Sequence, residues 1–189
     1  MKRKNKGAAG IAIIAIVVVL VIFFGGQWNN LVKLDEDVNS AWAQVENQVK
    51  RRADLIPNIV ETVKGYASHE KETFTEITKA RAGVSEAKNP KELAEANDEL
   101  TEAIQKLNVV VENYPKLKAN QNFLDLQAQL EGTENRIATE RMRYNKTVET
   151  YNQKVRRFPT NIIAKILGFE KRDYFEVSEK DKEVPEVKF

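Results

Sequence analysis

The sequence contains no cysteine and only one histidine, His69. The absence of cysteine excludes disulfides, thiolate metal sites and a cysteine nucleophile, although it carries no information about the compartment. Glycine and proline are scarce, with 8 and 5 among 189 residues, while 31% of the residues are charged and 42% are hydrophobic. This length, together with abundant Ala, Leu, Glu, Lys and Gln, predicts one mostly helical domain with a core.

The sequence also lacks the motifs of the common catalytic and metal sites. The stretch HEKET begins like the zinc motif HExxH, but Thr73 occupies the place of the second histidine. A weak metal site of His69 with Glu72 and Glu76 is the alternative to a solvated or capping histidine, in a helix crowded with Glu and Lys. Glycine loops for phosphates and the serine nucleophile elbow do not occur. We therefore expect no catalytic residue, no cofactor and no metal.

One long apolar run is present, GAAGIAIIAIVVVLVIFFGG at residues 7–26. At about 1.5 Å per helical residue, its length matches the roughly 30 Å hydrocarbon core of a bilayer. A cleaved signal peptide is the alternative, but its apolar region typically spans about 7–15 residues and ends at a small-residue cleavage site. FFGGQW does not offer a clear site of that kind. We predict an uncleaved, single-pass transmembrane anchor.

The charges beside this run predict its orientation. A basic tip, residues 1–6, carries four cations and leaves −2 for the rest of a chain whose net charge is +2. Lys33 is the only lysine or arginine in the twenty residues after the run. By the positive-inside rule, the N-terminus stays in the cytoplasm and the helical domain faces outward. Because the positive charge is confined to the tip, we expect no nucleic-acid partner.

Residues 27–169 show helical periodicity throughout. Apolar residues spaced by threes and fours form stripes from Leu31 to Tyr66, Phe74 to Val84, Leu93 to Tyr114 and Phe123 to Phe158. Asn89 predicts an N-cap, with Pro90 at the first helical position and Glu92 completing a capping box. TNIIAKILGF predicts a short helix closed by Gly168. A helix with one apolar stripe must bury that stripe against another helix. We therefore predict an all-α fold: an N-terminal transmembrane helix followed by an elongated antiparallel helical bundle of long helices.

The last segment, residues 170–189, holds twelve charged residues in twenty and is predicted to be a charged C-terminal tail. Two interpretations stay open for it. Disorder is one, because the composition is highly charged. Docking on the bundle is the other, through four apolar residues, Val177, Val184, Val187 and Phe189.

The stretch RRADLIPNIV, residues 51–60, contributes to a polar stripe on the first bundle helix. The stripe members repeat at spacings of four and three, which places them on one helix face: Asn47, Arg51, Asp54, Asn58 and Glu61. Arg51 and Asp54 are spaced for an ion pair along the helix. The stripe is either a solvated face or a lateral protein interface, and it supplies our candidate interaction residues.

Three further residues break local rules and are given architectural roles. Arg52 falls inside the apolar stripe, where a buried guanidinium needs a carboxylate partner, and the candidates are Glu131, Glu134 and Glu140. Pro57 frees the carbonyl of Ala53 and predicts a bend or a break in the helix. Gly132 lies inside a helix, which a close helix contact or a bend would explain.

Three long segments resemble the signature of the bacterial LemA family. They are LDEDVNSAWAQVENQVKRRADLIPNIVETVKGYASHE, YPKLKANQNFLDLQAQLEGTENRIATERMRYNKTVETYNQKVRRFP and the terminal FEVSEKDKEVPEVKF. The visible departure is Val49, where the family often has an aromatic residue. The resemblance implies a single N-terminal span followed by an all-α bundle, and it brings no catalytic residues. The orientation is predicted from the charges beside the span. With that orientation, the expected location is the inner membrane of a bacterial cell, with the domain in the periplasm or outside.

The leading interpretation is a membrane-anchored, non-catalytic scaffold or interaction module of the bacterial cell envelope. It would act through an unidentified envelope protein partner or by self-assembly as a homo-oligomer. The alternative is a membrane-surface or membrane-shaping protein whose bundle helices open onto lipid, but the helices lack the basic polar face typical of that function. A metal-dependent hydrolase acting through His69 is the minor alternative.

Overall fold

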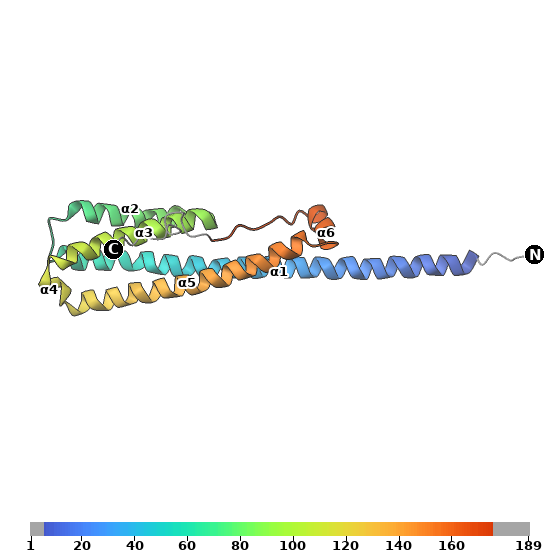
Figure 1. Cartoon of the computed structure of the whole chain (residues 1–189), viewed down its shortest axis with the longest axis horizontal. Coiled ribbons are helices and arrows are strands. Elements are labelled where there is room, and N and C mark those ends of the chain that lie inside the picture. The colour runs from blue at the N-terminus through green and yellow to red at the C-terminus, as the bar shows by residue number, and fades with distance from the viewer. Residues whose placement is uncertain (1–5, 176–189) are drawn as a thin grey trace, which may run out of the picture. The chain divides into compact units, whose positions relative to one another are not determined.

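The computed structural model describes residues 6–175, and over that range the chain contains helices and no strands (Figure 1). The helices are α1 (Lys6–Lys64), α2 (Lys71–Glu86), α3 (Pro90–Glu112), α4 (Pro115–Lys118), α5 (Gln121–Arg156) and α6 (Thr160–Leu167). The predicted all-α class, with a long apolar N-terminal helix and a helical bundle, is confirmed. Residues 1–5 of the predicted basic tip lie outside the described range.

The apolar run lies inside α1, which continues to Lys64 without interruption. Among the described helices, α1 is the one long and apolar enough to cross a bilayer, and no residue of its most apolar stretch is buried inside the protein. Buried apolar surface is what normally explains such a helix in a water-soluble protein. The chain therefore has the anchor-like N-terminal helix that the sequence predicts.

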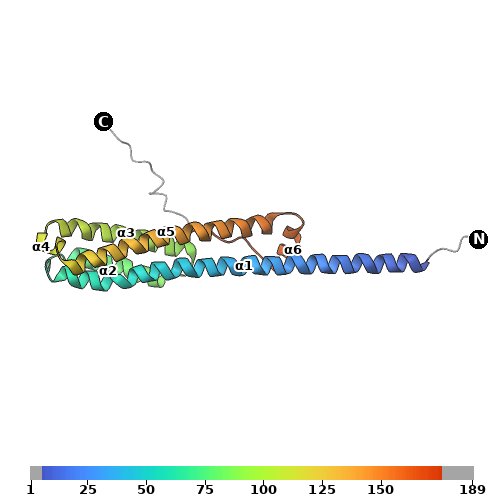
Figure 2. The same ribbon diagram turned by 90° about the horizontal axis from the view of Figure 1, so that it is seen from below.

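The chain divides into two compact units, which are described separately. Unit 1 comprises Met1–Asn39 and Thr147–Arg172, and unit 2 comprises Ser40–Lys146 and Asp173–Phe189. Within unit 2, α2 and α3 lie side by side with the unit-2 portions of α1 and α5, and neighbouring helices run antiparallel (Figure 1, Figure 2). Their apolar stripes meet in one core, whose largest fully buried aliphatic residues include Ile56, Ile59, Ile77, Leu93, Leu100, Leu107 and Ile137.

Pro57 lies within α1, and the helix continues through it, so a broken helix is the wrong alternative. The carbonyl of Ala53 loses its usual donor four residues later because proline has no N–H. Arg81 of α2 supplies the missing donor, with its Nε 3.2 Å from the Ala53 oxygen. The neighbouring helix thus satisfies the backbone acceptor that Pro57 leaves unpaired.

The start of α3 follows the predicted capping box, except that the Glu92 carboxylate bonds to the backbone N–H of Lys88 and not to that of Asn89. The Oδ1 atom of Asn89 accepts a hydrogen bond from the Glu92 backbone N–H at 2.9 Å, and Pro90 occupies the first helical position. The Glu92 carboxylate accepts from the backbone N–H of Lys88, one residue before the cap, at 2.8 Å. Both bonds satisfy N–H groups around the helix start, which have no partner within the helix.

Residues 173–175 are attached to α5 within unit 2. The Asn145 side chain pairs with the backbone of Phe175 in both directions, at 2.9 and 3.0 Å, and the Tyr144 hydroxyl donates to the Asp173 carbonyl. Phe175 is 2% exposed and lies against Trp42, with ring centroids 6.3 Å apart. The first residues of the predicted tail therefore contact the bundle. The four apolar residues considered for docking lie beyond Phe175, outside the described residues.

Unit 1 is held together by a second asparagine contact. Asn152 of α5 pairs with the backbone of Arg172 in both directions, each bond at 2.9 Å. The Arg172 guanidinium reaches Asp35 of α1 at 2.9 Å and Asn39 at 3.3 Å. Burial raises the pKa of the neighbouring Tyr151, the Asp35 carboxylate raises it further, and Arg172 opposes the rise. This polar cluster joins the two chain segments that make up the unit.

The apolar stripes extend further in the sequence than in the structure. Phe158 and Tyr66, the last members of two predicted stripes, are 75% and 43% exposed. Both lie after the ends of their helices, since α1 ends at Lys64 and α5 at Arg156. Helical spacing no longer predicts burial once the helix has ended.

Candidate interaction face

The polar stripe of α1 lies on the outside of unit 2. All five predicted members are exposed: Asn47, Arg51, Asp54, Asn58 and Glu61. Glu61 pairs with Lys64 at 2.9 Å. The spacing-based pair of Arg51 with Asp54 does not form among the described residues, so both side chains are available to another molecule.

Arg52, next to the stripe, points the opposite way and is 4% exposed. Its Nη1 donates to Asn97 Oδ1 at 3.1 Å and to Thr101 Oγ1 at 2.9 Å, both on α3. The same nitrogen lies 2.5 Å from the Glu134 carboxylate on α5, an ion pair without hydrogen-bond geometry. Burial lowers the pKa of the Arg52 guanidinium, and the carboxylates of Glu134 and Asp98 counteract that effect. Arg52 therefore connects three helices of unit 2.

The structure selects Glu134 from the three carboxylates considered for Arg52, while Asn97 and Thr101 were missed by sequence reasoning. Asn97 is 5% exposed although it lies beside the apolar stripe of α3. The two residues are one helical turn apart, so they share a helix face. A polar pair at that spacing next to an apolar stripe is the signal that would have indicated a buried polar partner.

A groove of about 280 Å³ lies between α1 and α5 on the stripe side of unit 2. Its two cationic residues are Arg51 from α1 and Arg136 from α5, and both are exposed. Neither guanidinium has an ion pair or hydrogen bond within residues 6–175. The other lining residues are Leu55, Ala128, Gln129, Gly132 and Thr133.

Two buried polar atoms without partners lie on the same helix faces. Gln48 Oε1 and Glu140 Oε2 have no hydrogen-bond partner in the described chain. Gln48 is three residues before Arg51, and Glu140 is four residues after Arg136, which places each on the groove-facing side of its helix. Unpaired buried acceptors cost free energy, so these two atoms are local weaknesses of the packing between α1 and α5.

Gly132 contributes space to this groove. A Cβ atom built on it meets nothing within 4 Å, which contradicts the close helix contact predicted from its position. Its missing side chain instead leaves the groove open at that point, between Arg51 and Arg136.

Because nothing opposes a Cβ at this position, Gly132→Ala is expected to stabilise the protein by about 0.5–1 kcal/mol, the helix-propensity gain of alanine over glycine. Urea unfolding of the full chain in detergent micelles, followed by circular dichroism, measures this change. Gly168→Ala is the control in which the opposite effect is expected. Gly168 has φ +76, where a side chain is strained, so this substitution should lower the free energy of unfolding by about 1 kcal/mol. A destabilised Gly132→Ala protein would restore the close-contact explanation.

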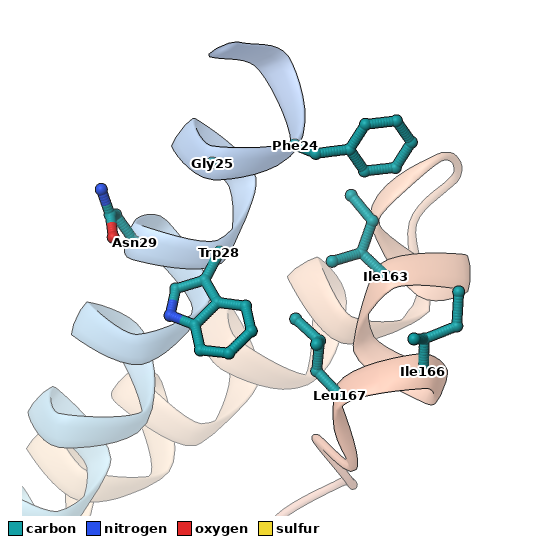
Figure 3. Close-up of a pocket in the computed structure, with 7 residues that line it drawn as sticks. All are labelled: Phe24, Gly25, Trp28, Asn29, Ile163, Ile166 and Leu167. Atoms are coloured by element: carbon teal, nitrogen blue, oxygen red, sulfur yellow. The ribbon is translucent and has the colours of Figure 1, made fainter. Parts of the chain in front are cut away.

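A second hollow, of about 320 Å³, lies within unit 1 between α1 and α6. Figure 3 shows Phe24 and Trp28 of α1 on one side and Ile163, Ile166 and Leu167 of α6 on the other. Its lining is almost entirely apolar, which favours a hydrocarbon ligand over a polar substrate and its chemistry.

The structure gives no support to the metal alternative at His69. The side chain is exposed, in the connection between α1 and α2. No group of three or more His, Cys, Asp or Glu residues within the described part of the chain is arranged to hold a metal ion.

Comparison with known proteins identifies relatives along most of the chain. The sequence profile of the LemA family matches residues 41–189. Protein LemA of Metamycoplasma hominis is 27% identical over 165 residues, covering 85% of this chain and 74% of that protein. Magnetosome protein MamQ 2 of Paramagnetospirillum magneticum is 24% identical over 204 residues, covering 93% and 75%. Magnetosome protein MamQ of Magnetospirillum gryphiswaldense is 23% identical over 203 residues, covering 92% and 75%.

Proposed function

Because this chain belongs to the LemA family and carries an anchor-like apolar helix, we propose that it is a membrane-anchored, non-catalytic interaction module of the bacterial cell envelope. Its binding surface is the polar stripe of α1 together with the groove beside it. The N-terminus lies in the cytoplasm and the bundle outside, an orientation supported by the basic residues before the span.

The observation that carries this proposal is the open groove with two unpaired arginines. The two arginines lie on different helices, Arg51 on α1 and Arg136 on α5, and both line the same groove. This convergence on one hollow is more than a solvated helix face requires. Arginine is suited to recognition because its planar guanidinium binds carboxylates through two parallel hydrogen bonds.

The chemistry of the groove favours an acidic peptide segment as the occupant. Arg51 and Arg136 would bind its carboxylates, while Leu55 and Ala128 offer a small apolar contact between them. A partner protein supplies such a segment in the leading form of the proposal. A second copy of this chain is the self-assembly form, and residues 176–189 of the same chain, which contain five acidic residues, are the competing internal occupant.

Photo-crosslinking in bacterial membranes tests the proposal on the full chain. A photoreactive amino acid at Asn58, on the polar stripe, is expected to give a defined adduct that the double charge reversal Arg51→Glu, Arg136→Glu abolishes. Lys79→Glu, Lys91→Glu is the matched control, because it makes the same change in charge at two other exposed positions. Mass spectrometry of the adduct identifies the contacted peptide, which we expect to be rich in Asp and Glu.

Three results would contradict the proposal. One is an adduct that persists in the double charge reversal, and another is one that disappears equally in the lysine control. The third is an adduct confined to residues 176–189 of the same chain, which would show an internal occupant. Circular dichroism on the purified variants verifies that each remains folded.

A further inference from the structure

The outward edge of α6 in unit 1 is apolar. Ile162 and Ile166 are one helical turn apart and are 50% and 75% exposed. Phe158, just before the helix, is 75% exposed. The inward face is already filled by Thr160, Ile163 and Ala164, which are buried. A helix in water normally carries polar residues on its outer face, so this edge requires an apolar neighbour.

The position of α6 along α1 indicates what that neighbour is. The hollow beside α6 is lined by Phe24 and Gly25, near the end of the apolar run, and by Trp28. The Thr160 hydroxyl donates to Gln27 Oε1 at 3.2 Å, which fixes the start of α6 next to the first polar residue after the run. Tryptophan is enriched where a membrane span meets water. The helix α6 therefore lies beside the end of the apolar run, which is the depth of the membrane interface when α1 crosses a bilayer.

The charges around α6 agree with that depth. Arg156, Arg157 and Lys165 are exposed and have no ion pair among the described residues. Cations at the edge of a bilayer are attracted to the phosphates of anionic lipids. An apolar edge next to exposed cations is the pattern of a helix lying in a membrane interface.

We propose that α6 lies in the interface of the bilayer that α1 crosses, and that the hollow between Trp28 and α6 binds an acyl chain of an anionic phospholipid. Ile163, Ile166 and Leu167 form one wall for the chain, and Phe24 and Trp28 form the other (Figure 3). Three exposed cations at and just before α6 hold the headgroup: Arg156, Arg157 and Lys165. The site depends on the membrane anchor and is independent of any protein bound at the groove of unit 2.

Depth measurements with single spin labels test the placement of α6. Because the chain has no cysteine, each introduced cysteine gives one labelled position. In nanodiscs containing anionic phospholipid, labels at Ile162→Cys and Ile166→Cys are expected to be accessible to oxygen and protected from a water-soluble nickel reagent. A label at Asn161→Cys, exposed on the same helix, is the matched control and is expected to show the reverse. Water accessibility at all three positions, or protection of the isoleucine positions from both reagents, would overturn the placement.

Fluorescence quenching tests the lipid site itself. In a Trp42→Phe background Trp28 is the sole tryptophan, and phospholipid brominated on its acyl chains is expected to quench it. Gly25→Leu places a side chain into the hollow and is expected to remove most of that quenching, since a Cβ on Gly25 meets no atom within 4 Å. Gly10→Leu is the control, because Gly10 is equally open and does not line the hollow. Unchanged quenching in Gly25→Leu would refute the acyl-chain site while leaving the protein-binding proposal unaffected.

Discussion

Arg52→Ala is expected to lower the free energy of unfolding by about 3 kcal/mol, the lower end of the range for breaking a buried ion pair. The lower end applies because the Glu134 side chain is 44% exposed and regains some hydration when its partner is removed. The buried Asn97 loses the donor to its Oδ1 atom, which adds the cost of an unpaired polar group. Urea unfolding of the full chain in micelles measures the difference.

Arg51→Ala is the matched control for this measurement. It removes the same side chain one residue earlier on α1, at an exposed position, and is expected to change stability by less than about 0.5 kcal/mol. Arg52→Ala combined with Glu134→Ala should cost less than the sum of the two single substitutions, because the two residues are in contact. A loss below about 1 kcal/mol in Arg52→Ala would reject the buried tie.

Phe175→Ala is expected to destabilise unit 2 by about 3 kcal/mol, as for other aromatic-to-alanine substitutions in cores. The ring is 2% exposed, and its backbone is held to Asn145 from both sides. Its removal also opens one face of Trp42, whose emission should shift to longer wavelength in a Trp28→Phe background. Both changes are measurable on the full chain, by urea unfolding and by fluorescence.

Tyr174→Ala controls for the loss of any aromatic ring from this segment. Tyr174 is 38% exposed and adjacent to Phe175, so its replacement should cost less than about 1 kcal/mol. Equal effects of the two substitutions would show that residues 173–175 contribute no specific packing. An unchanged Trp42 spectrum in Phe175→Ala would contradict the ring contact directly.

The sequence predicts most of the helical architecture because each helix signals itself locally. Periodic apolar spacing indicates the buried stripes, and the Asn89 cap and Gly168 mark helix ends that the structure reproduces. Local signals do not report which helices meet. The choice of Glu134 for Arg52 depends on the register of α1 against α5, which no spacing within one helix determines.

The candidate sites were less predictable for the same reason. The stripe residues could be placed on an exposed face, but Arg136 became relevant only when α5 was positioned beside Arg51. Gly132 was predicted to mark a close helix contact or a bend, and the close contact is absent because Gly132 lines an open groove. The hollow of unit 1 joins residues 24–29 to residues 163–167, and no short-range pattern links segments so distant.

The hydrogen bond from Arg81 to the Ala53 carbonyl also limits how α2 can dock. A regular helix presents a repeating surface, on which a neighbouring helix can shift by one turn and find nearly equivalent contacts. Pro57 interrupts that equivalence by exposing one backbone acceptor at a single level of α1. A shift of α2 by one turn would separate the Arg81 guanidinium from this carbonyl and leave the carbonyl unpaired. Pro57 thus helps to fix the register of α2 against α1, because only one of several similar docking positions pairs this carbonyl.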